Sequence, residues 1–261
     1  MKLFLKVVAF LIFVYWFVAY AAAPFFWKHY ENQRELENEP KWTRTAEGIQ
    51  GDPLNVGFVG TPDEILKALK NAGWAPADRS SFRSDLKIAT GVLFKRSYPT
   101  APVSLLYLYS RPQDMAFEKE VGDSPSQRHH VRLWQTALLI EGRSLWLGAA
   151  TFDKGIGVNR NTGKFTHHID ANIDQERDLL MNDLRITKQL SELYQVTGRG
   201  PSVNDYNGSH DRYYTDGEMT IGWISPGNHG GALEIKPNPV GIKMKNSVYS
   251  LFKNWVPKAH E

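Results

Sequence analysis

One uninterrupted apolar segment near the amino terminus constrains this chain more than any other feature. Residues 7–27 carry no charged side chain and consist mainly of Val, Leu, Ile, Phe and Ala. A helix of about 20 such residues is long enough to cross a bilayer. Lys2 and Lys6 precede the segment and three aromatic residues, 25–27, close it, as at the two interfaces of a membrane helix. The sequence therefore predicts one amino-terminal transmembrane helix that contacts the membrane through residues 7–27.

A cleaved secretory signal peptide is the alternative interpretation of this segment. Residues 19–21, Ala-Tyr-Ala, match the small-residue pattern of a cleavage site. The apolar run continues to Trp27, which is long for a signal peptide and favours an uncleaved anchor. Basic residues also follow the segment, but long downstream domains are exported largely regardless of charge. We expect a short cytoplasmic amino terminus and an exported domain.

The chain as a whole has the composition of a folded protein. Of 261 residues, 42% are apolar and 23% are charged, so the chain can bury a core. The 31 Lys and Arg nearly balance the 28 Asp and Glu, so no nucleic-acid partner is expected. The chain has no cysteine, which excludes disulfides, thiolate nucleophiles and Cys-bound zinc.

We divide the chain into four parts by composition. They are a membrane anchor (1–27), a polar stalk (28–50), a globular domain (51–224) and a tail rich in Gly, Pro and Lys (225–261). The domain begins with a short apolar strand, followed by Thr-Pro-Asp-Glu at 61–64. This is a capping box with Pro at the first helical position, and it predicts a helix that ends at Gly73.

We predict the later elements of the domain from the alternation of apolar and polar residues and from the positions of turn-forming residues. The predicted elements are strands at 103–109, 129–136 and 165–169, a hairpin at 138–147, a loop at 111–126, helices at 79–94 and 174–188, and strands at 193–196 and 219–224. Asp174 is the expected N-cap of the second of these helices. Together these elements predict an α+β domain with a mixed or mostly antiparallel sheet and covering helices.

Residues 128–178 concentrate polar side chains and contain two adjacent pairs, His129-His130 and His167-His168. Neighbouring residues of a strand point to opposite faces, so only one histidine of each pair can share a face with Asp170. His130, His168 and Asp170 could then form an open three-ligand site for a divalent metal such as zinc, which would lower the pKa of a bound water.

Two other interpretations of the same stretch stay open. Arg128 and Arg132 flank the first pair and suit a phosphate or carboxylate better than a metal, and a neutral His130 could then act as an acid or base. In a hydrolase of this kind the catalytic residues would be His130, His168, Asp170 and Arg132. Alternatively, the histidines only bond their neighbours, while Asp170 and Asp174 cap a turn and a helix.

Several common catalytic motifs are absent from the sequence. Gly155-Ile-Gly157 lacks the third glycine of a dinucleotide fingerprint, and there is no P-loop, nucleophile elbow or His-Glu-x-x-His helix. We interpret Gly148, Gly155 and Gly157 as sites of close packing or bulges in strands. Residues 211–217 are polar and aromatic, and either line a pocket or close a hairpin.

The tail ends in an amphipathic segment. Val248, Leu251, Phe252 and Trp255 fall on one helical stripe. Such a helix either docks on the domain or lies at a membrane interface, where Lys243, Lys245 and Lys253 would assist.

Several motifs in order carry a family resemblance across residues 43–224. They lie at 51–56, 72–76, 98–109, 111–117, 128–134, 148–157, 166–170, 176–178, 211–213 and 215–217. The chain resembles the carboxy-terminal domain family of LssY, a protein associated with bacterial type I secretion. Larger relatives look like fusions to membrane-embedded DedA-type and phosphatidic-acid-phosphatase-type domains. The resemblance implies lipid-phosphate or envelope chemistry nearby, but this chain has no lipid-phosphatase signature.

The resemblance implies a location at the bacterial inner membrane, with a single span and a periplasmic domain. Two classes of function follow. One is a binding or assembly module that recognises a lipid headgroup, a cell-wall fragment or a membrane-protein partner. The other is a membrane-anchored hydrolase that acts on a phosphate- or carboxylate-bearing envelope substrate.

Overall fold

The computed structural model describes part of the chain, in two compact units. The described residues are 2–18, 22, 36, 38–77, 105–122, 127–158, 165–196, 204–228, 232–238, 242–244, 246–247 and 250. The first unit comprises Met1–Asn38 and Asn238–Pro257, and the second comprises Glu39–Pro237 and Lys258–Glu261.

The first unit begins with helix α1 (Lys2–Phe17), which has no buried side chain. None of the helices in the described ranges combines the length and apolar content needed to cross a membrane. Residues 19–21 and 23–27 of the predicted span lie outside the described residues.

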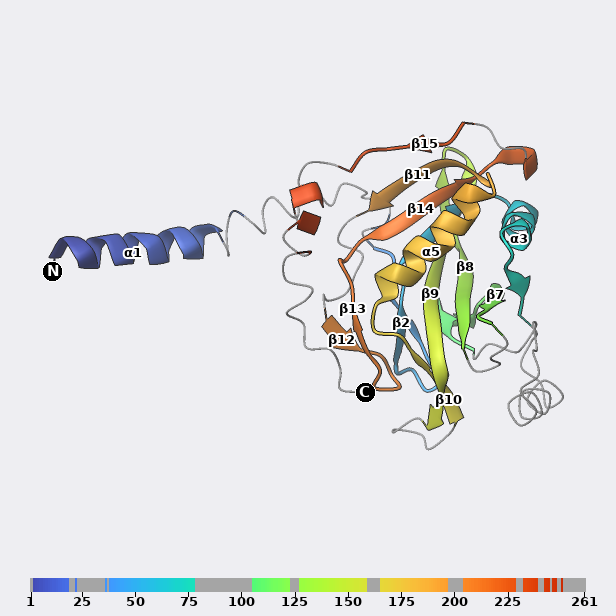
Figure 1. Ribbon diagram of the computed structural model, residues 1–261, viewed down its shortest axis with the longest axis horizontal. Helices are drawn as coiled ribbons and strands as arrows, with labels where there is room; N and C mark the ends of the chain where they lie inside the picture. The colour runs from blue at the N-terminus through green and yellow to red at the C-terminus, as the bar shows by residue number, and fades with distance from the viewer. Residues whose placement is uncertain are drawn as a thin grey trace. The chain divides into compact units, whose positions relative to one another are not determined.

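The second unit is built on a mixed, mainly antiparallel sheet of nine strands in the described ranges (Figure 1). Its order is β15-β11-β14-β3-β9-β8-β7-β4, and β10 also pairs with β9. The strands are β3 (Val56–Val59), β4 (Ala75–Pro76), β7 (Met115–Glu120), β8 (Arg128–Ile140), β9 (Arg143–Val158), β10 (Phe165–Ile169), β11 (Leu190–Val196), β14 (Met219–Ile224) and β15 (Glu234–Ile235). The α+β prediction with a mixed sheet is confirmed.

Two smaller sheets complete the described strands. The first has the order β2-β1-β5-β6 and the second pairs β12 with β13. Their strands are β1 (Trp42–Arg44), β2 (Gln50–Pro53), β5 (Tyr107–Leu108), β6 (Arg111–Pro112), β12 (Asn204–Tyr206) and β13 (Arg212–Tyr214). Strand β1 lies within the residues expected to form the stalk.

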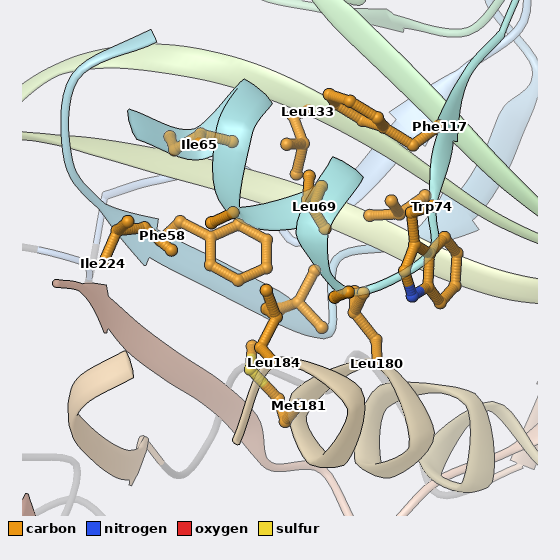
Figure 2. Packing of buried hydrophobic residues seen from close by; sticks show 14 of the residues in the cluster. Phe58, Ile65, Leu69, Trp74, Phe117, Leu133, Leu180, Met181, Leu184 and Ile224 are labelled. Carbon is orange, nitrogen blue, oxygen red and sulfur yellow. The ribbon is translucent and has the colours of Figure 1, made fainter. Parts of the chain in front are cut away.

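Helices α3 (Pro62–Asn71) and α5 (Ile173–Ile186) cover one face of the main sheet. The predicted capping box is present, since Thr61 and Glu64 exchange side-chain and backbone hydrogen bonds. Figure 1 shows α5 lying across β9 and β14. Figure 2 shows how Phe58 of the sheet packs with Leu69 of α3 and Leu184 of α5. This apolar layer holds both helices on one face of the sheet.

Two local predictions differ from the structure, and a third concerns residues that the structure does not describe. The predicted loop at 111–126 is wrong over β6 and β7, because β7 pairs in register with β8 along its whole length. Asn172, not Asp174, caps α5, since its side chain accepts a hydrogen bond from the backbone N–H of Gln175. The predicted helix at 79–94 lies outside the described residues.

The close-packing interpretation of Gly148 is confirmed. A Cβ atom added there would meet Leu133 Cδ2 at 2.6 Å and Val56 Cγ2 at 2.8 Å. Gly155 adjoins a register shift between β9 and β10, where His168 pairs with Gly155 but Ile169 pairs with Asp153. Both glycines therefore mark features of strand pairing.

Candidate functional site: a polar network beneath the main sheet

Strand β8 divides the polar stretch between two environments. Val131 and Leu133 point into the apolar layer beneath the helices. Arg128, His130 and Arg132 alternate with them and point to the opposite face, as strand geometry predicts. All three are buried, so both faces of this part of β8 are covered.

Arg128 forms a buried ion pair with β7. Its Nη1 atom donates to Glu118 Oε2 at 2.8 Å, and the two side chains are 1% and 0% exposed. Glu120 Oε1 lies 3.8 Å from the Nη2 atom of the same guanidinium. A charge-assisted pair of this kind compensates for the removal of both groups from water only while both partners are present.

His130 lies against a carboxylate of the neighbouring strand. Its Nε2 atom is 2.8 Å from Asp153 Oδ2, and the side chains are 1% and 4% exposed. The β8–β9 register places His130 opposite Thr151 and Arg128 opposite Asp153, so these side chains share one face. This pairing leaves His130 sealed inside the domain.

Arg132 connects the main sheet to β2. Its Nη1 atom is 3.3 Å from Asp52 Oδ2, and Asp52 Oδ1 accepts a hydrogen bond from Asn207 Nδ2 at 3.3 Å. Burial raises the pKa of Asp52, an effect that Arg132 and the Asn207 hydrogen bond oppose. Asp153 and Asp211 act electrostatically on the same carboxyl and also raise its pKa.

The network reaches the surface at His168. Asn207 Oδ1 accepts from the backbone N–H of Asp211 at 2.9 Å, and Asp211 Oδ1 lies 2.6 Å from His168 Nδ1. The backbone N–H of Ile169 donates to the second oxygen of Asp211 at 3.3 Å. The His168 side chain is 33% exposed. The sequence of contacts Arg132, Asp52, Asn207, Asp211 and His168 thus runs from the interior to solvent.

We call the whole set on this face the polar network. Its members are Asp52, Glu118, Arg128, His130, Arg132, Asp153, His168, Asn207 and Asp211.

The other member of the first histidine pair belongs to the helical face. His129 Nδ1 lies 2.8 Å from Glu176 Oε2 of α5, and its ring packs against Phe152 with the centroids 4.9 Å apart. Burial raises the pKa of Glu176, while His129 opposes that shift. The pair therefore joins α5 to the sheet. The side chain of His167 lies outside the described residues.

Asp170 and Asp174 have local and structural partners. Asp170 Oδ1 accepts from the backbone N–H of Asn172 at 2.8 Å, which makes a tight turn before α5. Asp174 accepts from Thr215 Oγ1 and from the backbone N–H of Asp216, each at 2.7 Å. Burial raises the pKa of Asp174 to about 6, although the nearby Arg177 guanidinium opposes the shift.

The described geometry does not bring the expected metal ligands together. No cluster of three or more His, Asp or Glu residues within the described ranges is arranged to hold a metal ion. Asp153 pairs with Arg128 on one side and with Ile169 on the other, so His130 and His168 lie on strands that flank β9. Each histidine lies against its own carboxylate, and β10 ends before Asp170. The zinc-site interpretation gains no support from this arrangement.

The expected anion-binding arginines are likewise turned inward. Arg128 is 1% exposed and lies against Glu118, and Arg132 lies against Asp52. Sequence reasoning missed the carboxylates of these pairs, because Asp52 lies 80 residues from Arg132 and because Glu118 lies on β7, which was predicted to be a loop. Asp153, the carboxylate beside His130, did leave a signal in the sequence, since Thr151 and Asp153 alternate with Ala150 and Phe152 along β9.

Comparison with known proteins identifies a family but no individual related protein. A family model described as LssY C-terminus matches residues 32–219. No curated protein matched the chain, and no solved structure matched it.

Proposed function

This chain belongs to the LssY C-terminus family, and we propose that it is a binding or assembly module of the bacterial cell envelope. In this proposal residues 7–27 anchor it in the inner membrane as a single span, and the domain lies in the periplasm. It would recognise a lipid headgroup, a cell-wall fragment or a membrane-protein partner.

The observation that favours a binding module is that the arginine and histidine side chains of the polar stretch lie against carboxylates inside the domain. Arg128, His129, His130, Arg132 and His168 each lie within 3.3 Å of a carboxylate oxygen of the same domain. Side chains committed in this way hold strands and helices together. Four of the five are less than one fifth exposed, so they offer little to an external metal or substrate.

Observations from both the sequence and the structure support the proposed membrane anchor. The apolar side chains of α1 are exposed along the whole helix, which would be unfavourable for a segment surrounded by water. Lipid would cover them, and residues 19–27 would complete the span to the length that a bilayer requires.

Protease digestion of spheroplasts tests the anchor and its orientation. A carboxy-terminal epitope should be lost on digestion of intact spheroplasts, because the domain is predicted on the periplasmic side. Protection of the epitope until the inner membrane is broken would contradict the orientation. Release of the intact chain by alkaline carbonate would contradict the anchor itself.

A membrane-anchored hydrolase is the second candidate, favoured by the His168–Asp211 pair. Asp211 lies at Nδ1 of the imidazole, as the orienting carboxylate does in catalytic histidine pairs. Because His168 is partly exposed, its Nε2 atom could take a proton from water that attacks a phosphate or carboxyl ester. Arg132 and His130 would support this site from the interior through the polar network, and Asp170 would border it.

Hydrolysis of nitrophenyl phosphate and nitrophenyl acetate by the full chain separates the two candidates. A hydrolase should lose on the order of 10²- to 10⁴-fold in kcat/KM in His168→Ala. The control is His210→Asn, since His210 is exposed and has a positive φ of 61°, which Asn tolerates. The binding module predicts the same low rate in all three proteins. A rate lost in His168→Ala and kept in His210→Asn would contradict it.

A further inference from the structure

We propose that the exposed face of the small β2-β1-β5-β6 sheet binds an acidic segment of a protein partner. The face is formed by Arg44 of β1, by Leu105, Tyr107 and Tyr109 in and around β5, and by Pro112 of β6. We call it the small-sheet face. It extends the proposed binding module, on which it rests, by giving the module a binding surface and its partner a chemical class.

The strand register places three of these side chains in one row. Arg44 pairs with Tyr107, and Tyr107 pairs with Pro112 on its other side. Residues that lie directly opposite each other on neighbouring strands project to the same face of a sheet. Arg44 and Pro112 are exposed and Tyr107 is half-buried, so solvent reaches the row.

Exposure alternates along the segment that carries the middle of this row. Leu105 is 48% exposed and Tyr109 is 41% exposed, whereas Leu106 and Leu108 between them are 8% and 3% exposed. This period of two is that of a strand with one face against the core and the other in solvent. Large apolar side chains therefore stand on the solvent side, where such strands normally carry polar residues.

Tyr109 is held in an unfavourable backbone conformation. It forms the two-residue turn between β5 and β6 with Ser110, and the two residues have positive φ of 52° and 59°. Turns of this kind normally contain Asn or Gly, because a bulky residue is strained at positive φ. Arg111 Cζ lies over the Tyr109 ring, 5.9 Å from its centre, and Glu39 accepts a hydrogen bond from the hydroxyl. A strained, exposed and fixed aromatic ring is typical of a residue retained for binding.

One positive charge on this face has no carboxylate beside it in the part of the chain that the structure describes. Arg44 Nη1 donates to the backbone carbonyl of Gly48 at 2.9 Å, and no described carboxylate pairs with Arg44. Arg111, in contrast, forms an ion pair with Asp114. A guanidinium beside exposed apolar side chains is complementary to a partner that carries a carboxylate among apolar residues.

These features favour a protein segment over other occupants of the small-sheet face. Tyr and Arg are enriched at the centres of protein interfaces, where Lys, Asp and Glu are depleted. An anionic bilayer is normally bound by a cluster of about 4–8 cations, far more than this face offers. In a two-fold dimer a second copy would bring Arg44 towards its own equivalent, which is unfavourable. An acidic segment with apolar neighbours satisfies both the charge and the apolar side chains.

Selection of phage-displayed random peptides on the immobilised full chain, in mild detergent, tests this surface. We expect the enriched peptides to carry Asp or Glu beside Leu or aromatic residues. Arg44→Glu and Tyr109→Asn should each raise the Kd of these peptides on the order of tenfold or more. Asn tolerates positive φ, so Tyr109→Asn removes the ring and keeps the turn. High salt should weaken the wild-type complex.

Matched controls make the same kinds of change on helix α5. Arg185→Glu reverses an exposed charge, and Ile186→Asn removes an apolar side chain that is 62% exposed. Both should leave the Kd of the enriched peptides unchanged. Near-ultraviolet circular dichroism of all four variants should match that of the wild type, so that a lost complex reports the surface and not the fold.

Several results would overturn the proposal. No peptide could be enriched, the enriched peptides could lack acidic residues, or they could bind Arg44→Glu as tightly as the wild type. Self-association or chitotriose binding that Arg44→Glu abolishes would assign the face to a second copy or to a glycan instead. Peptides that bind without Arg44 contradict only this surface. Nitrophenyl ester hydrolysis that is lost in His168→Ala contradicts the binding module itself.

Discussion

Replacing Arg128 with Met tests whether the polar network holds the domain together. The substitution keeps most of the side-chain volume but leaves Glu118, which is 0% exposed, without the guanidinium 2.8 Å away. Removing one partner of a buried ion pair costs about 3–5 kcal/mol in the free energy of unfolding. For a domain of this size, about 1 kcal/mol corresponds to roughly 2–4 °C in Tm, so we expect a fall of about 6–20 °C.

The assay is thermal and urea unfolding of the full chain in mild detergent, followed by tryptophan fluorescence. Arg185→Met is the matched control, since Arg185 is exposed on α5 and its Nη2 atom donates to Asn182 Oδ1. It should change stability by no more than about 0.5 kcal/mol. Adding Glu118→Leu to Arg128→Met should restore much of the loss, because it removes the uncompensated buried charge. A loss below about 1 kcal/mol for Arg128→Met would refute this reasoning.

Two other perturbations follow from particular residues. The pKa of Asp174 is raised in the folded state from 3.8 to about 6, so the folded chain binds that proton more tightly than the unfolded chain does. Relative to Asp174→Asn, the wild type should therefore lose about 3 kcal/mol of unfolding free energy as pH rises from about 4 to 7, and a pH-independent difference would contradict this. Gly148→Ala should cost about 1–3 kcal/mol in urea unfolding, since a Cβ atom would overlap Leu133 and Val56. Gly155→Ala, which meets nothing within 4 Å, should cost less, and equal costs would count against the packing argument.

The sequence was sufficient to predict those elements whose conformation is determined by residues close together in the chain. The capping box at Thr61 and Glu64 closes within four residues, so α3 could be placed from the sequence. The β8–β9 hairpin turns at Glu141 and Gly142, both with positive φ, between two alternating runs. Strand alternation also placed the two histidines of the first pair on opposite faces.

Non-local pairing explains what sequence reasoning missed. Strand β7 contains Glu118, a fully buried charged residue whose ion-pair partner, Arg128, lies on the neighbouring strand β8. Asp52 and Arg132 are 80 residues apart, and Asp211 and His168 are 43 residues apart. No periodicity within one segment can identify such partners. The sequence shows that polar residues are concentrated in this stretch. It does not show that their side chains pair with carboxylates from β2, β7, β9 and the segment before β13.

The central claim is that the polar stretch is committed to internal pairing and serves a binding module. Zinc bound per chain, measured by equilibrium dialysis of the full protein at neutral pH and micromolar free zinc, tests it most directly. The account predicts less than stoichiometric zinc, equal in the wild type and in His168→Ala. One zinc per chain in the wild type, lost in His168→Ala but kept in His210→Asn, would contradict it.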